Sequence, residues 1–176
     1  MRRTKFTPNE LILHQDYAEL ILRNIKHEEV GRVKVDVSDI PLVQNHRWHI
    51  ALGYAITQIQ QKQIRMHRLL LDASPLFQVD HINHDRLDNR RKNLRLCTKQ
   101  QNHFNRQEGE NNSSGRIGVV YAKREKKWQA QIVVNQKVIW LGYHKTFESA
   151  VRARKEAERK YFGEFAYRGN ELQCDS

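Results

Sequence analysis

Residues 79–102 read Val79-Asp80-His81-Ile82-Asn83-His84-Asp85-Arg86-Leu87-Asp88-Asn89-Arg90-Arg91-Lys92-Asn93-Leu94-Arg95-Leu96-Cys97-Thr98-Lys99-Gln100-Gln101-Asn102. Asp80 and His81 set a carboxylate beside an imidazole, and two carboxamides, Asn93 and Asn102, follow 13 and 22 positions after Asp80. Carboxylate and carboxamide oxygens prefer hard cations such as Mg²⁺ or Mn²⁺. A histidine, with an ordinary pKa of about 6.5, can take a proton from water near neutral pH. The stretch therefore predicts Asp80 and Asn102 as metal ligands and His81 as a general base.

The same stretch is rich in basic side chains that can bind a polyanion. They are Arg86, Arg90, Arg91, Lys92, Arg95 and Lys99. Phosphodiester cleavage needs a deprotonated water and a cation that stabilises charge on the phosphoryl oxygens, so this combination suits hydrolysis of a nucleic-acid backbone. Neighbouring side chains of a strand point to opposite faces. Both side chains can therefore reach one phosphate only if the chain leaves strand geometry at Asp80–His81.

Local patterns predict the elements around these residues. Leu94–Cys97 alternates apolar and polar side chains, which is typical of a short strand. Thr98 and Gln101 fit a capping box, with Thr98 as the N-cap. Asn102 would then lie on a helix, and the order of elements is strand, long loop, strand, helix.

Residues 78–106 resemble the HNH endonucleases of the ββα-metal class, particularly the variant of intron-encoded and phage homing enzymes. The resemblance implies that His81 is the general base, that Asp80 and Asn102 hold one divalent cation, and that Asn93 fixes the loop and orients the imidazole. Asn102 stands where many relatives have His, and His84 where many have Gly. In some relatives, four cysteines bind a structural zinc ion in this region. Only Cys97 and Cys174 occur here, which excludes a structural zinc of that type.

Single residues of these motifs can also be interpreted as purely structural. An isolated Asp-His pair is usually a surface or capping pair, and His81 with His84 could suggest a metal pair, although we favour no role for His84. His67, shortly before the motif, is expected to give structural support. The other histidines carry no spacing signal and are expected to be packing or surface groups: His14, His27, His46, His49, His103 and His144.

A second region begins after an apolar-free stretch, residues 107–115, which is typical of a linker. Three apolar runs follow, at 117–122, 128–134 and 138–143, with a hairpin turn at 135–137 between the last two. Thr146 can cap a helix that continues to about Phe162 and stops at Gly163. We expect three antiparallel strands packed against one helix over 116–168, and a tail at 169–176.

This region resembles the DNA-binding domain of plant ethylene-response factors. The matching elements include Gly118-Val119, Lys127-Trp128, Ala130-Gln131-Ile132 and Trp140-Leu141-Gly142. In that family the sheet contacts DNA, and the positions carried over are Tyr121, Lys127, Gln131, Val133, Val138 and Trp140. Val133 and Val138 cannot make polar contacts, so the plant sequence preference should not transfer. Further basic candidates on the first strand and its turn are Arg116, Lys123, Arg124 and Lys126. One of Trp128 and Trp140 is expected to pack on the helix instead.

The first 75 residues are less informative and are assigned to the same domain as the motif, 1–106. Hairpins are expected near Gln15-Asp16 and between 53–59 and 64–69, around 60–63. A short helical or turn segment is expected to start at Asp39–Pro41.

Composition agrees with a nucleic-acid partner. The net charge is +11, with 18 basic and 13 acidic residues through residue 112 and 13 and 7 beyond it, so both halves face the same polyanion. A membrane surface could also attract this charge, but neither an apolar run of about 18 residues nor a signal peptide is present, so we expect no membrane span or export. Two lone cysteines fit a reducing cytoplasm, bacterial or of a phage-infected cell.

The sequence thus predicts an α+β protein: a β-rich domain that ends in a ββα-metal motif, and a small three-stranded sheet with one helix. The predicted function is hydrolysis of double-stranded DNA, with one Mg²⁺ or Mn²⁺ ion per chain. A catalytically silent DNA-binding protein and an enzyme that acts on RNA are the alternatives. One set of catalytic residues and no heptad pattern favour a monomer, and possible nicking of one strand.

Overall fold

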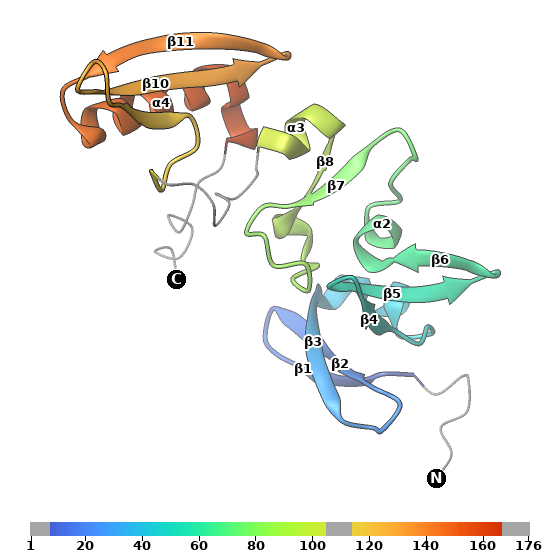
Figure 1. Cartoon of the computed structure of the whole chain (residues 1–176). Coiled ribbons are helices and arrows are strands. Elements are labelled where there is room, and N and C mark those ends of the chain that lie inside the picture. Colours follow the sequence, from blue (N-terminus) through green and yellow to red (C-terminus); the bar gives the residue numbers. More distant parts are fainter. Residues whose placement is uncertain (1–7, 105–113, 167–176) are drawn as a thin grey trace. The chain divides into compact units, whose positions relative to one another are not determined.

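The computed structural model describes residues 8–104 and 114–166. The chain divides into two compact units, Met1–Thr98 and Lys99–Ser176 (Figure 1). Both contain antiparallel strands and helices, so the predicted α+β class is confirmed at this level. Of the predicted linker only Ser114 and Gly115 are described, and the predicted tail lies outside the described residues. In the described part of the chain, no helix has the length and apolar character needed to cross a membrane.

The first unit opens with two three-stranded antiparallel sheets. One has the order β1 (Glu10–Leu13), β2 (Tyr17–Arg23), β3 (Glu29–Asp36), and the other the order β4 (His49–Ala51), β5 (Tyr54–Ile59), β6 (Lys62–Arg65). The predicted hairpin near Gln15-Asp16 is confirmed as β1–β2, and the predicted turn at 60–63 is confirmed between β5 and β6.

Short helices connect these strands. The helical segment expected at Asp39–Pro41 is confirmed as α1 (Ile40–Val43), which follows a 3₁₀ turn, Val37–Asp39. The expectation of a strand through Leu69 is wrong beyond Arg65, because Met66–Leu70 forms helix α2. The helix buries Met66, His67 and Leu70, and the spacing of one turn between Met66 and Leu70 puts both on one face.

One hydrophobic core joins the two sheets and α2. Trp48 is 1% exposed and its indole Nε1 donates to the Val43 carbonyl at 2.9 Å. The core is lined by Ala18, Leu20, Leu22, Val33, Val35, Val43, Trp48, Ala55, Met66, Leu70 and Leu94. The β-rich lead-in and the motif therefore share a core, because Leu94 belongs to the motif.

The motif itself is built on a two-stranded ribbon. β7 (Gln78–His81) pairs antiparallel with β8 (Leu94–Cys97), and a 3₁₀ turn, Arg91–Asn93, precedes β8. The loop between the strands docks against β3: Lys34 N donates to Leu87 O at 2.9 Å and Asn89 N donates to Lys34 O at 2.8 Å. The first sheet therefore holds the loop of the motif in place.

The second unit matches the predicted sheet and helix. Its sheet has the order β11 (Lys137–His144), β10 (Lys127–Val134), β9 (Val119–Ala122), and helix α4 (Phe147–Phe162) packs against it. Thr146 caps α4 by accepting from Ser149 N at 3.2 Å, and Gly163 stops it with φ 54°, as predicted. The β10–β11 turn is Asn135-Gln136, with φ of 51° and 63°.

Helix α3 (Lys99–Phe104) begins directly after Thr98, as the predicted capping box requires. It groups with the second unit, where the rings of Phe104 and Phe162 stack at 3.9 Å and Gln100 hydrogen bonds to Asn135. The strand, loop, strand, helix order along the chain is therefore present.

Candidate active site

Asp80 and His81 are the last two residues of β7. Asp80 pairs in register with Arg95 of β8, and His81 with Leu94, whose burial in the core fixes the ribbon. As whole residues, Asp80 and His81 are 6% and 5% exposed. The chain keeps strand geometry through this pair. β7 continues to His81 and ends there, so the two side chains start from opposite faces of the ribbon.

The Asp80 carboxylate faces Arg95. Its Oδ2 accepts from Arg95 Nη2 at 2.7 Å and from Nε at 2.9 Å. Both side chains are largely buried, at 7% and 15% exposed, so the charges attract each other with little screening by water. Arg95 therefore holds one carboxylate oxygen of Asp80 in a fixed orientation.

His81 lies in an aromatic pocket of the first unit. Its ring is 5.0 Å from the His67 ring, edge-on, and 6.1 Å from the Tyr54 ring. Burial lowers the pKa of His81 below the ordinary 6.5, although a hydrogen bond with Asn89 and the charges of Asp80 and Asp85 act in the opposite direction. The imidazole is therefore neutral at pH 7 and able to accept a proton.

His67 supports this pocket as a neutral ring. Burial, followed by the charge of His81, lowers its pKa to about 3. The ring of Tyr54 packs edge-on to His67 at 5.2 Å, and the guanidinium groups of Arg65 and Arg86 each lie 4.7 Å from the centre of the Tyr54 ring. His67 is thus a packing residue beside His81, in agreement with the structural role expected for it.

Asn93 closes the loop that follows His81. Its Oδ1 accepts from Asn83 N at 2.9 Å and its Nδ2 donates to Asp88 O at 2.8 Å. Its backbone carbonyl accepts from Ile82 N at 2.9 Å. Asn93 therefore acts on His81 through the loop backbone, whereas the carboxamide that interacts with the imidazole is that of Asn89.

Asp88 is buried in the same loop and accepts several hydrogen bonds there. It is 2% exposed and accepts from Arg90 at 2.7 and 2.8 Å and from Asn83 Nδ2 at 3.0 Å. Burial alone would raise its pKa, but the hydrogen bonds and charge of Arg90, together with Asn83, outweigh burial and lower the pKa. A further loop residue, His84, has φ 65°, in the region that favours glycine.

Residues 75–104 match the family model described as HNH endonuclease. Over 140 residues the chain is 31% identical to an uncharacterized HNH endonuclease of Acanthamoeba polyphaga mimivirus, and the match covers 75% of this chain and 71% of the relative. The chain belongs to the HNH endonuclease family. No solved structure matches it. HNH nucleases generally use a divalent metal ion.

The donor set of this HNH endonuclease fits such an ion in its chemistry. Among the described residues there is no group of three or more His, Cys, Asp or Glu side chains that could hold a metal. Asp80 and Asn102 supply one carboxylate and one carboxamide, and Mg²⁺ is commonly held by one or two protein oxygens, with waters and substrate phosphates completing its shell. Asn102 lies on α3, in the second unit.

The basic residues of the motif are used in different ways. Arg90 pairs with Asp88, Arg91 with Asp39 at 2.8 Å and Arg95 with Asp80. Arg86 donates to the Leu52 carbonyl at 3.2 Å and covers the Tyr54 ring. Lys92 and Lys99 are exposed. Sequence alone could not assign these partners, and all six remain predicted DNA contacts.

In the second unit, α4 packs on one face of the sheet, and the opposite, open face exposes Val133 and Trp140 within the described part of the chain. Ala130 and Ile132 point toward the helix and are 0% exposed, so their neighbour Gln131 points to the open face, where it pairs with Trp140. Trp140 is 49% exposed, whereas Trp128 packs against Phe147 of the helix at 4.9 Å. One tryptophan thus packs on the helix and the other does not, as expected.

Two predicted DNA contacts of this unit have other surroundings. Tyr121 pairs with Trp128 and its ring lies 5.2 Å from the indole, on the helix side of the sheet. Arg116 forms an ion pair with the buried Glu158. The remaining basic candidates, Lys123, Arg124, Lys126 and Lys127, are exposed.

Sequence reasoning missed Tyr54 and Asn89, which surround His81. Tyr54 is distant in sequence and carries no motif signal. Asn89 lies within the motif, but its 1% exposure depends on the docking of the loop against β3, which sequence patterns do not reveal.

Proposed function

We propose that the protein is a divalent-metal-dependent endonuclease that hydrolyses phosphodiester bonds of double-stranded DNA. The observation that carries the proposal is a buried, neutral imidazole, His81, next to the Asp80 carboxylate in a chain of the HNH endonuclease family. A neutral imidazole can take the proton of an attacking water, which is the step that needs a base near pH 7.

The surroundings of His81 suit this task. The rings of Tyr54 and His67 exclude water from one side of the imidazole, and the charge of Asp80 favours the imidazolium that forms when the proton is taken. Asn93 and Asp88 hold the loop behind it. When bound by Asp80 and Asn102, a Mg²⁺ or Mn²⁺ ion would stabilise charge on the phosphoryl oxygens and the leaving alkoxide.

We further propose that the open face of the C-terminal sheet directs the enzyme to DNA. Gln131 and Trp140 offer a carboxamide and an aromatic ring on that face, and Lys123, Arg124 and Lys126 lie in the turn between β9 and β10. Carboxamides read base edges and lysines bind phosphates, so the two groups can divide recognition and affinity between them.

A plasmid assay tests the catalytic proposal. Wild-type protein with Mg²⁺ should convert supercoiled plasmid to cut product, and His81→Ala should slow the reaction by about 10²–10⁴-fold, the usual contribution of a general base. His27→Asn is the matched control, because His27 is exposed and has φ 66°, which asparagine tolerates. Cleavage by His81→Ala at the wild-type rate would refute the assignment, and equal activity in excess EDTA would refute the metal requirement.

The same assay separates the alternatives. A single set of catalytic residues attacks one phosphate at a time, so nicked circles should accumulate before linear DNA at limiting enzyme. Linear product from the first time point, together with a dimeric mass in solution, would contradict a monomeric nickase. Binding without any cleavage would favour a silent DNA-binding protein, and cleavage confined to RNA would favour the RNA alternative.

A further inference from the structure

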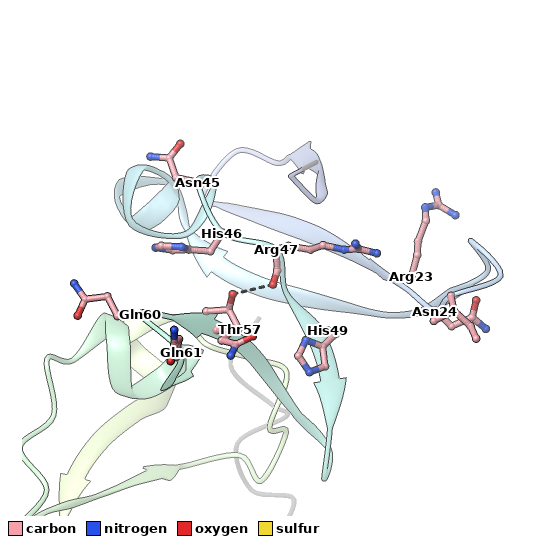
Figure 2. Close-up of a pocket in the computed structure, with 11 residues that line it drawn as sticks. Arg23, Asn24, Asn45, His46, Arg47, His49, Thr57, Gln60 and Gln61 are labelled. Carbon is pink, nitrogen blue, oxygen red and sulfur yellow. Dashed lines mark hydrogen bonds between the residues drawn. The ribbon is translucent and has the colours of Figure 1, made fainter. Parts of the chain in front are cut away.

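A polar groove of about 700 Å³ lies in the first unit, among residues that no motif marks. Three segments line it: the end of β2 and its turn, the segment that leads into β4, and the β5–β6 hairpin (Figure 2). The lining side chains are Arg23, Asn24, Ile25, Asn45, His46, Arg47, His49, Thr57, Gln58, Gln60 and Gln61. None of them is acidic.

The core determines why Arg47 and His49 face outward. Trp48 between them is buried, and its backbone is fixed by Asn9, whose Oδ1 accepts from Trp48 N at 2.7 Å and whose Nδ2 donates to Trp48 O at 3.1 Å. In an extended segment the flanking side chains point opposite to the buried one. Thr57 Oγ1 donates to the Arg47 carbonyl at 2.8 Å and ties this segment to β5, as the dashed line in Figure 2 marks.

The groove carries positive charge that the fold does not use. Arg47 is exposed and has no ion pair or side-chain hydrogen bond within the part of the chain that the structure describes. Arg23, by contrast, is held by Glu10 at 3.0 Å. Glu28 accepts from Asn24 Nδ2 at 2.8 Å on the same rim, so Arg47 is the cation of the lining through which the groove can attract an anion.

Carboxamides supply the second chemical feature. Asn45, Gln58, Gln60 and Gln61 are exposed and present both donors and acceptors. Gln60 and Gln61 form the hairpin tip with φ of 47° and 63°, a conformation that glutamine rarely adopts. A tight two-residue turn fixes the backbone of these two glutamines beside the cationic segment.

The rim is rigid and bears an apolar tip. Asn24 fixes the β2–β3 turn, because its Oδ1 accepts from Lys26 N at 2.9 Å and from Glu28 N at 3.0 Å. The turn holds Ile25 at 93% exposure. An exposed aliphatic side chain at the edge of a basic groove can pack against a sugar or a base.

We propose that this groove binds a strand of the DNA substrate, away from the catalytic ribbon, with Arg47 on phosphate and the glutamine carboxamides on base edges. This inference rests on the proposed function, because it names a second contact for the same DNA. Arginine binds phosphate through a planar fork of donors, and a carboxamide can pair with the edge of adenine through one donor and one acceptor. The unpaired Arg47 favours an anionic ligand, and the exposed carboxamides favour one that also offers hydrogen-bonding edges, as nucleic acid does.

The test measures binding rather than cleavage, in the full chain. A fluorescently labelled random-sequence duplex is titrated in EDTA with His81→Ala protein, at several salt concentrations. The groove variant adds Arg47→Ala, His49→Ala and Gln58→Ala, all at exposed positions, and the control adds Lys62→Ala and Gln63→Ala, which removes one positive charge and one amide at exposed positions outside the groove. In the groove variant, loss of one phosphate contact should reduce the slope of log binding constant against log salt concentration by roughly 0.9 and weaken binding several-fold. Slope and affinity of the control should stay those of the parent.

A photoreactive amino acid gives an independent readout. Placed at Ile25, it should crosslink to the duplex; placed at Leu13, which is 67% exposed near the other end of β2, it should not. The groove proposal would be overturned if the groove variant had the same DNA affinity and salt slope as the control and the parent, and if Ile25 crosslinked no better than Leu13. It would also be overturned if the parent bound polyglutamate as tightly as the duplex. Failure of the wild-type enzyme to cut plasmid would instead overturn the proposed function, because the binding test needs neither metal nor cleavage.

Discussion

Replacement of Asn93 by alanine separates a loop-supporting role from a chemical one. The change removes the acceptor for Asn83 N and the donor to Asp88 O. A buried polar group that loses its partner costs about 1–3 kcal/mol. The bond to Asp88 is fully buried and the bond to Asn83 partly so. The free energy of unfolding of the first unit should therefore fall by about 2–4 kcal/mol.

Urea unfolding measures this loss. With a slope of about 2 kcal/mol per molar, the midpoint should move down by about 1–2 M. Trp48 reports on the first unit when Trp128 and Trp140 are replaced by phenylalanine, since the chain has three tryptophans and Trp48 is the buried one in that unit. Asn93→Asp keeps the acceptor but not the donor, so its midpoint should lie between those of Asn93→Ala and the wild type.

The cleavage rate of the folded protein completes the argument. Both polar atoms of the Asn93 side chain bond to the loop backbone, so the rate should fall less than in His81→Ala. Gln63→Ala, an exposed amide in β6, is the control and should change neither quantity. An Asn93→Ala protein that unfolds at the control midpoint but has lost all cleavage would refute the reasoning, and would assign Asn93 to the reacting phosphate.

Three further predictions concern stability and affinity. Because the pKa of His67 is about 3 when folded and about 6.5 when unfolded, its contribution to stability is complete above pH 6.5 and declines toward pH 3. At pH 4.5 the loss due to His67 should be about 2–3 kcal/mol in urea melts, and His67→Gln should reduce the pH dependence of stability by that amount, while the part due to the lowered pKa of His81 remains. Gly118→Ala should destabilise the second unit by about 2 kcal/mol or more in thermal melts, because φ is 75° and a Cβ would lie 2.2 Å from the Arg154 guanidinium; a wild-type melting temperature would contradict this. Each replacement of Lys123, Arg124 or Lys126 by alanine should reduce the slope of log binding constant against log salt concentration by roughly 0.9. An unchanged slope would show that these residues do not contact DNA.

The elements that sequence predicted well are those with local causes. The cap at Thr146, the stop at Gly163 and the strands of the β10–β11 hairpin follow from patterns within a few residues. Helix α2 was not predicted because apolar Ile64 and Met66 alternate with polar Arg65, as in a strand. The burial of Met66 and Leu70 against the core favours a helix instead. Tertiary packing overrides local preference there.

The candidate site divides in the same way. Spacing located His81, Asp80 and Asn93, because these residues lie in one continuous motif. Spacing did not reveal Tyr54, which reaches the His81 pocket from another sheet, or Arg95 as the partner of Asp80, which depends on the register of β7 and β8. The sequence did not predict the groove at Arg47, because its residues come from three segments with no shared pattern.

A basic composition does not say which cations meet DNA. Arg90 neutralises Asp88, which is buried, and the pair contributes little net charge to the surface. Removal of Arg90 would leave a buried carboxylate without its partner, a change that costs about 3–5 kcal/mol, so the fold would suffer before DNA binding. Arg47 and Lys92 are exposed and have no ion pair within the described part of the chain, so their removal should leave the fold intact and act on affinity alone. We therefore expect Arg47 and Lys92 to contribute more to DNA affinity than the paired arginines of the motif, which first neutralise Asp39, Asp80 and Asp88.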